Sequence, residues 1–182
     1  PSTHAFSLQW SAAPRYTPDM ELHRRAGSPV TLDATPLHQR RDPKTRRRLS
    51  APALRSFFKI AEAWHLSGDQ QRALLGWPPE STFYKYKAGQ AGTLSFDMLV
   101  RISLLLGIYK DLHILYPDRD LADGWLHLPN SNPLFGGRPA LTLMTEGGID
   151  GLYQVRRLLD GRRHVLKGVV HVAARQGAGK QV

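Results

Sequence analysis

The chain has 182 residues, no cysteine, a hydrophobic fraction of 41%, a net charge of +10 and a pI near 10.3. This length suits one domain or two small ones, and the missing cysteine excludes disulfides, thiol catalysis and cysteine-based zinc sites. No apolar run reaches the roughly 18 residues of a membrane helix, and no apolar signal-peptide core begins the sequence, so we expect a cytoplasmic protein without a membrane partner. The positive charge favours a phosphate-rich partner, because bound Lys and Arg release counterions; a basic surface kept for solubility is the alternative.

Residues 1–50 carry the strongest basic bias and show no sustained periodicity. They hold nine basic and four acidic residues, and Arg40 to Arg48 form a basic cluster. Prolines interrupt any helix longer than two or three turns, and they stand at Pro14, Pro18, Pro29, Pro36 and Pro43. The sequence therefore predicts an irregular arm, either lying on a nucleic-acid backbone or solvated and disordered.

Helical periodicity begins after Ser50, which we expect to cap an amphipathic helix over residues 51–64. Pro52 falls in the first turn of this helix, where the missing N–H has little consequence. The apolar residues that recur at helical spacing are Leu54, Phe57, Phe58, Ala61 and Trp64.

Two short helices are expected next, over about residues 69–75 and 80–87. Gly76 ends the first, and residues 77–79 form the turn between them. The side chains expected to hold the two helices together are Leu74, Leu75, Trp77 and Phe83. Two short helices joined by such a turn form a helix-turn-helix, whose second helix enters the major groove of DNA.

The exposed side of this motif supplies the candidate DNA contacts. They are Gln70, Gln71, Ser81, Thr82, Tyr84, Lys85 and Lys87. The first residues of the second helix face base edges in this motif, so Ser81 and Thr82 are candidates for base or phosphate contacts. The two lysines suit phosphates as point charges, and the two glutamines, at the start of the first helix, could donate to a phosphate.

The remaining periodicity predicts an all-α fold, with helices over about residues 96–106, 109–115, 118–128, 139–145 and 149–160. Ser95 is expected to cap the first of these, and Gly107 to end it. Trp125 either anchors the core or forms an interface hot spot. Asn130 is expected to fix its turn by bonding the backbone that follows it.

No arrangement of catalytic residues emerges from the sequence. Gly179-Lys180 lacks the upstream Gly and the following Ser or Thr of a phosphate-binding loop, and His164 and His171 have no neighbouring carboxylate. We therefore predict no catalytic residue, no metal ligand and no cofactor, and a protein that is not an enzyme.

Two stretches of the sequence follow patterns of one known protein family. Residues 71–87 place Leu75-Gly76 and a hydrophobic residue before Ser81-Thr82 and an aromatic, an order that resembles the Xre-like helix-turn-helix. Residues 125–141 resemble the toxin-binding domain of Xre/ParS-type antitoxins, whose pattern reads roughly W-L-x-x-P-N-x-x-F-x-G-x-x-P-L. The residues that fit it are Trp125, Leu126, Pro129, Asn130, Phe135, Gly136, Gly137, Pro139 and Leu141.

The resemblance covers about residues 55–170 and implies an antitoxin of a type II toxin–antitoxin system, with a helix-turn-helix DNA-binding region (51–116) and a toxin-binding domain with a C-terminal tail (117–182). The irregular basic arm (1–50) precedes both and has no counterpart in the family pattern. Such an antitoxin blocks the active site of a RES-fold, NAD-consuming toxin and represses its own operon as a homodimer on operator DNA. The residues that would face the toxin are Arg156, Arg157, Arg162, Arg163, Leu166, Lys167, Gly168 and Val169. The alternatives are a stand-alone helix-turn-helix transcriptional regulator whose C-terminal half only dimerises, and a pure inhibitor that binds no DNA.

Overall fold

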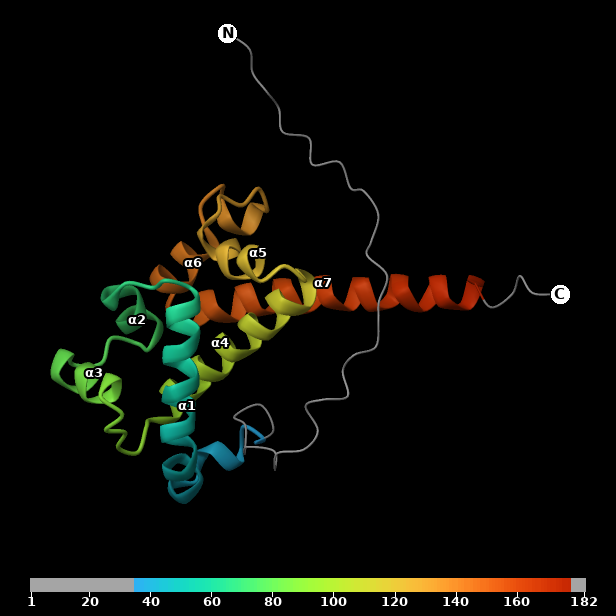
Figure 1. Ribbon diagram of the computed structural model, residues 1–182. Helices are drawn as coiled ribbons and strands as arrows, with labels where there is room; N and C mark the ends of the chain where they lie inside the picture. Colours follow the sequence, from blue (N-terminus) through green and yellow to red (C-terminus); the bar gives the residue numbers. More distant parts are fainter. Residues whose placement is uncertain (1–34, 178–182) are drawn as a thin grey trace, which may run out of the picture.

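A computed structural model describes the backbone of residues 35–177 and the side chains of residues 35–165 (Figure 1). The predicted arm before residue 35 and the segment 178–182 lie outside the described residues. The described chain contains no β-strand, which confirms the predicted all-α fold. Its helices are α1 (Pro43–Ala63), α2 (Gly68–Leu74), α3 (Glu80–Lys87), α4 (Phe96–Leu115), α5 (Arg119–Gly124), α6 (Ala140–Glu146) and α7 (Gly148–Gly177), with short 3-10 turns η2 (Gln39–Arg41), η3 (Trp125–His127) and η4 (Pro133–Phe135).

Helix α1 begins eight residues earlier than the sequence predicts. Asp42 is its cap and accepts a hydrogen bond of 2.8 Å from the Thr45 N–H, and Pro43 occupies the first helical position. The bonds from Thr45 hold the pKa of Asp42 below its usual range. The predicted cap at Ser50 is therefore wrong, because Asp42-Pro43 supplies an earlier start signal. The Ser50 hydroxyl instead bonds the carbonyl of Arg46, at 2.6 Å, inside the helix.

Helix α4 is one continuous helix, although the sequence predicted two helices separated at Gly107. Ser95 caps it as predicted, by accepting a bond of 3.1 Å from the Met98 N–H. Gly107 lies buried in its middle, where the Arg156 guanidinium donates 2.8 Å to the Gly107 carbonyl. A Cβ on Gly107 would lie 2.7 Å from that guanidinium, so the glycine allows the arginine to approach rather than ending the helix.

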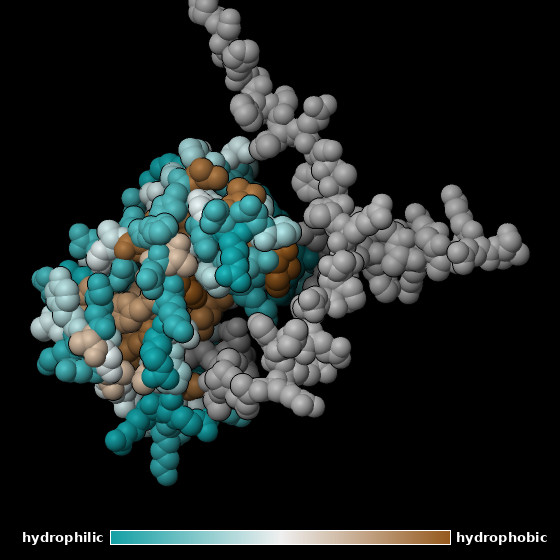
Figure 2. All heavy atoms as spheres, in the orientation of Figure 1, coloured by the Kyte–Doolittle hydropathy of each residue, from teal (hydrophilic) through white to brown (hydrophobic). Residues whose placement is uncertain are grey.

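The core forms where α4 packs between α1 and α7, with α6 closing one end (Figure 1). Its largest fully buried side chains include Phe57 of α1, Trp64 at the C-cap of α1, and Ile102, Leu105 and Ile108 of α4. The same cluster continues without a break into α7, whose contributions are Leu152, Val155 and Leu159. The helix-turn-helix region and the C-terminal region therefore share one core. Figure 2 shows hydrophilic side chains along the solvent side of α1, with apolar surface beside them.

The C-terminal region departs from the predicted helix boundaries at two places. The expected helix over 118–128 ends at Gly124 and continues only as the 3-10 turn η3, and both Leu121 and Leu128 are exposed. Helix α7 was expected to end near residue 160, but it continues to Gly177 and extends away from the other helices (Figure 1).

Candidate functional site

Helices α2 and α3 form the predicted helix-turn-helix. Ser67 and Gln70 make a capping box at the start of α2, with the Gln70 N–H donating 3.2 Å to the Ser67 hydroxyl and the Ser67 N–H donating 2.8 Å to the Gln70 side chain. Leu74, Leu75 and Phe83 are buried, as the sequence predicted for the contact between the helices. The packing places α3 as an outer helix of the bundle, and none of the other described helices covers its solvent side (Figure 1).

The turn between α2 and α3 contradicts the prediction for Trp77. Gly76 and Trp77 both have positive φ, at 83° and 57°, and the Trp77 N–H donates 2.8 Å to the Arg72 carbonyl. This backbone turns the indole outward, so Trp77 is 58% exposed and does not hold the two helices together. Its only ring partner among the described residues is the Arg72 guanidinium, 5.5 Å from the ring centre. Pro78 is buried in its place.

The candidate DNA contacts fall into two groups: side chains exposed on α3, and two glutamine side chains that form hydrogen bonds within the protein. Ser81, Tyr84 and Lys85 are exposed and Thr82 is half-buried, all on α3. Lys87 is also exposed, and its ammonium lies 5.9 Å from the centre of the Phe83 ring, at the edge of α3 that faces α1.

The two glutamines are held by the protein itself. The Gln71 side chain is buried and donates 2.8 Å to the Leu66 carbonyl, so it does not present its amide to a phosphate. Gln70 is half-buried and its side-chain oxygen serves the capping box. Sequence periodicity placed both at the start of α2 correctly, but it did not show that capping and packing engage their side chains.

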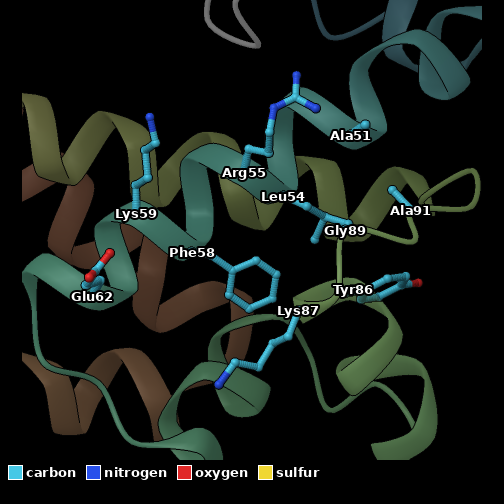
Figure 3. A pocket seen from close by; sticks show the side chains of 10 residues that line it. All are labelled: Ala51, Leu54, Arg55, Phe58, Lys59, Glu62, Tyr86, Lys87, Gly89 and Ala91. Atoms are coloured by element: carbon cyan, nitrogen blue, oxygen red, sulfur yellow. The ribbon is translucent and has the colours of Figure 1, made fainter.

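A pocket of about 290 Å³ separates α3 from α1 (Figure 3). Arg55 and Lys59 lie on its α1 side and Lys87 on its α3 side, with the ring of Phe58 between them; the charged ends of Arg55 and Lys59 point away from that of Lys87. Tyr86 also lines the pocket, and burial raises the pKa of its hydroxyl, which favours the neutral form. Arg55 and Lys59 of α1 therefore border the same pocket as the end of α3.

Side chains of the loop between α5 and α6 pack and form hydrogen bonds within the protein. Trp125 is 6% exposed and packs edge-on against Phe135, with ring centres 6.0 Å apart, so it anchors the core. The Asn130 side chain accepts a bond of 3.0 Å from the Asn132 N–H, which confirms its predicted role in the turn. The His127 ring nitrogen lies 2.8 Å from the Trp64 carbonyl and ties this loop to the end of α1.

Arg156 and Arg163, two of the predicted toxin contacts, are engaged inside the protein. Both pair with Asp111 of α4, whose side chain is 0% exposed; the Arg163–Asp111 distance is 3.1 Å. Asp160 lies 3.3 Å from Arg156 and 3.2 Å from Arg163 and completes the cluster. These two arginines thus attach α7 to α4. Asp111 was not among the predicted site residues; its only signal in the sequence was a carboxylate in the mainly apolar second half of α4, residues 102–115.

Arg157 and Arg162 occupy a different place, beside an open groove of about 650 Å³. The groove runs between the end of α4 and α7, and its apolar lining consists of Leu115, Tyr116, Leu158, Gly161 and Val165. Val165 is 67% exposed. The other predicted toxin contacts, residues 166–169, belong to the backbone of α7, and their side chains lie outside the described residues.

Over the part of the chain that the structure describes, no three His, Cys, Asp or Glu side chains are arranged to hold a metal ion. No helix in that part is both long and apolar enough to cross a membrane.

Comparison with known proteins matches two family models to adjoining parts of the chain. Residues 42–107 match the antitoxin Xre-like helix-turn-helix domain, and residues 111–164 match the antitoxin Xre/MbcA/ParS C-terminal toxin-binding domain. The uncharacterized protein y4oB of Sinorhizobium fredii (strain NBRC 101917 / NGR234) is 44% identical over 110 residues, which are 60% of this chain and 83% of that protein. No solved structure matches the chain significantly.

The matches follow the structure closely. The first begins at the Asp42 cap of α1, and the two meet within α4, between Gly107 and Asp111. The two matches confirm both resemblances noted in the sequence. Neither domain family consists of enzymes, which agrees with the prediction that the protein is not an enzyme. The chain therefore belongs to the Xre/MbcA/ParS family of antitoxins, in which an Xre-like helix-turn-helix domain precedes a toxin-binding domain.

Proposed function

We propose that this antitoxin neutralises a RES-fold, NAD-consuming toxin by occluding its active site, and represses its own operon by binding operator DNA. The observation that carries the proposal is the presence of two separate surfaces on one shared core. One is the exposed polar side of α3, and the other is the groove between α4 and α7. We place the boundary between the DNA-binding and toxin-binding regions near residue 116, at the end of α4.

The DNA-binding surface consists of the exposed residues of α3. Ser81 and Tyr84 would face the major groove, and Lys85 would reach a phosphate. A single helix of this kind covers one half-site, so we propose a homodimer that binds two half-sites about 34 Å apart.

The toxin-binding surface consists of the groove and the α7 residues that continue it. Its floor is apolar, and Arg157 and Arg162 stand at its edge, a combination typical of the central part of a protein interface. Since α7 extends away from the bundle beyond this groove, its C-terminal segment has the reach to enter a cleft of a bound partner (Figure 1). We propose that this segment, including residues 166–169, covers the NAD pocket of the toxin.

Co-expression with the product of the neighbouring gene tests this function. The tagged chain should co-purify with a RES-fold protein, native mass spectrometry should give the stoichiometry, and the complex should lack the NAD-consuming activity of the free toxin. A chain that elutes alone as a dimer, beside a fully active neighbour, would instead identify a stand-alone transcriptional regulator.

A further inference from the structure

Helix α1 carries a row of basic side chains that no part of the fold explains. The row consists of Lys44, Arg48, Arg55 and Lys59, which we call the α1 stripe, and all four side chains are exposed. Their spacings of four, seven and four residues place them within about 60° of the helix circumference, along about 22 Å of its length. Figure 2 shows hydrophilic residues in a line along the exposed side of α1.

The α1 stripe does not stabilise the helix. Helix α1 holds six basic residues and one acidic residue, Glu62. In the described structure, Arg48, Arg55 and Lys59 form no salt bridge. Two pairs of the stripe are like charges four residues apart, which repel each other. Lys44 stands in the first turn, where the helix dipole disfavours a cation, although its charge also attracts the Asp42 carboxylate at the cap. An external polyanion would remove these penalties.

Contacts of α1 place the stripe beside the helix-turn-helix. The Arg46 guanidinium donates 3.3 Å to the Leu94 carbonyl, and the Leu94 N–H donates 2.9 Å to the Ser50 hydroxyl, so the first half of α1 is attached to the loop that follows α3. Farther along, Arg55 and Lys59 stand across the pocket from Lys87, at the end of α3 (Figure 3).

We propose that the α1 stripe is a second DNA-binding element, which contacts the sugar–phosphate backbone flanking the half-site that α3 reads. Each DNA strand offers one phosphate per about 3.4 Å of helix axis, so a strand alongside the stripe would pass about six phosphates. Four contacts fit within that length. The contacts add affinity without sequence preference, because phosphates are the same in every sequence. This inference rests on the proposed DNA-binding function.

The test replaces all four stripe residues by glutamine. The variant is Lys44→Gln, Arg48→Gln, Arg55→Gln and Lys59→Gln. A control with the same change in net charge replaces three exposed basic residues that lie outside the stripe and outside both proposed binding surfaces, Lys110→Gln, Arg119→Glu and Arg138→Gln. Fluorescence anisotropy would measure the Kd for a labelled duplex of the DNA upstream of the gene, from 50 to 200 mM KCl.

The stripe variant should bind more weakly, with a log–log salt slope flatter by up to about 3.6, or 0.9 per phosphate contact. Over this fourfold rise in salt, the wild-type affinity should therefore fall about 150-fold more than that of the variant. The control should keep nearly the wild-type slope. Circular dichroism should show a melting temperature for the stripe variant at or above that of the wild type, because a repulsion has been removed.

Three outcomes would overturn the inference. A stripe variant with the wild-type slope would show that the stripe does not contact phosphates. If that variant also lost the co-purifying neighbour protein, the stripe would be a protein-docking surface instead. A wild-type chain that binds no upstream DNA even at 50 mM KCl would overturn the proposed DNA-binding function together with the stripe.

Discussion

Replacing Asp111 by Asn should destabilise the whole protein. Asp111 is 0% exposed and pairs with two arginines of α7, so its charge is the main partner of two partly buried guanidinium groups. Removing one partner of a buried ion pair lowers the free energy of unfolding by about 3–5 kcal/mol. We expect the lower end, about 3 kcal/mol, because Asp160 still lies within 3.3 Å of both arginines. Asn keeps the size of the side chain, so the loss reports the charge rather than a cavity.

The assay is urea unfolding followed by circular dichroism, with thermal melts in parallel. A loss of about 3 kcal/mol corresponds to a fall in Tm of roughly 6–12 °C for a protein of this size. Asp160→Asn is the matched control, since it removes the same charge beside the same arginines from a side chain that is 33% exposed. Asp160→Asn should lower the free energy of unfolding by less than about 1 kcal/mol. If Asp111→Asn lost no more stability than this control, the reasoning that the buried carboxylate holds α7 to α4 would be refuted.

Three further predictions concern the surfaces and the core. Trp77→Gly should lower the free energy of unfolding by less than about 1 kcal/mol, or raise it, because the indole is exposed and the φ of Trp77 is positive. Trp125→Ala should lower the free energy of unfolding by about 3–5 kcal/mol, because it removes a buried indole. Equal losses for the two variants in urea unfolding would contradict this contrast. Lys85→Ala with Lys87→Ala should flatten the log–log salt slope of DNA binding by about 2, and an unchanged slope in the anisotropy assay would exclude both lysines from the phosphate interface. Deleting residues 166–182 should weaken toxin inhibition in an NAD-consumption assay and leave DNA binding intact; a shortened chain that still inhibits fully would rule out the occluding segment.

Local signals in the sequence were sufficient where one residue determines a backbone state. Ser95 and Asn130 form the hydrogen bonds that their types and positions predicted. Apolar spacing likewise identified the buried residues of the helix-turn-helix, Leu74 and Phe83 among them. These features depend on neighbours within a few residues, which the sequence displays directly.

Long-range contacts decided the features that the sequence did not predict. Gly107 has the local appearance of a helix end, but it is retained inside α4 because Arg156, 49 residues later, occupies the space of a side chain. The same arginine was predicted to face the toxin, but it pairs with Asp111 inside the protein. Trp77 was predicted to be buried from its hydrophobicity, yet the positive φ of its turn points it outward. Periodicity cannot show any of these three results, because each depends on a partner or a backbone angle.

The position of α4 determines how the two proposed binding surfaces are related. Its first residues follow the loop that leaves α3, and its last residue, Leu115, lines the groove beside α7. A helix of 20 residues spans about 30 Å, so one rigid element reaches both surfaces without a flexible linker between them. The buried Asp111 attaches α7 to this helix near the groove. DNA-binding and toxin-binding surfaces should therefore unfold in one transition, and an Asp111→Asn variant should lower the midpoint for both. Two separate transitions, one for each surface, would show that the shared core does not couple them.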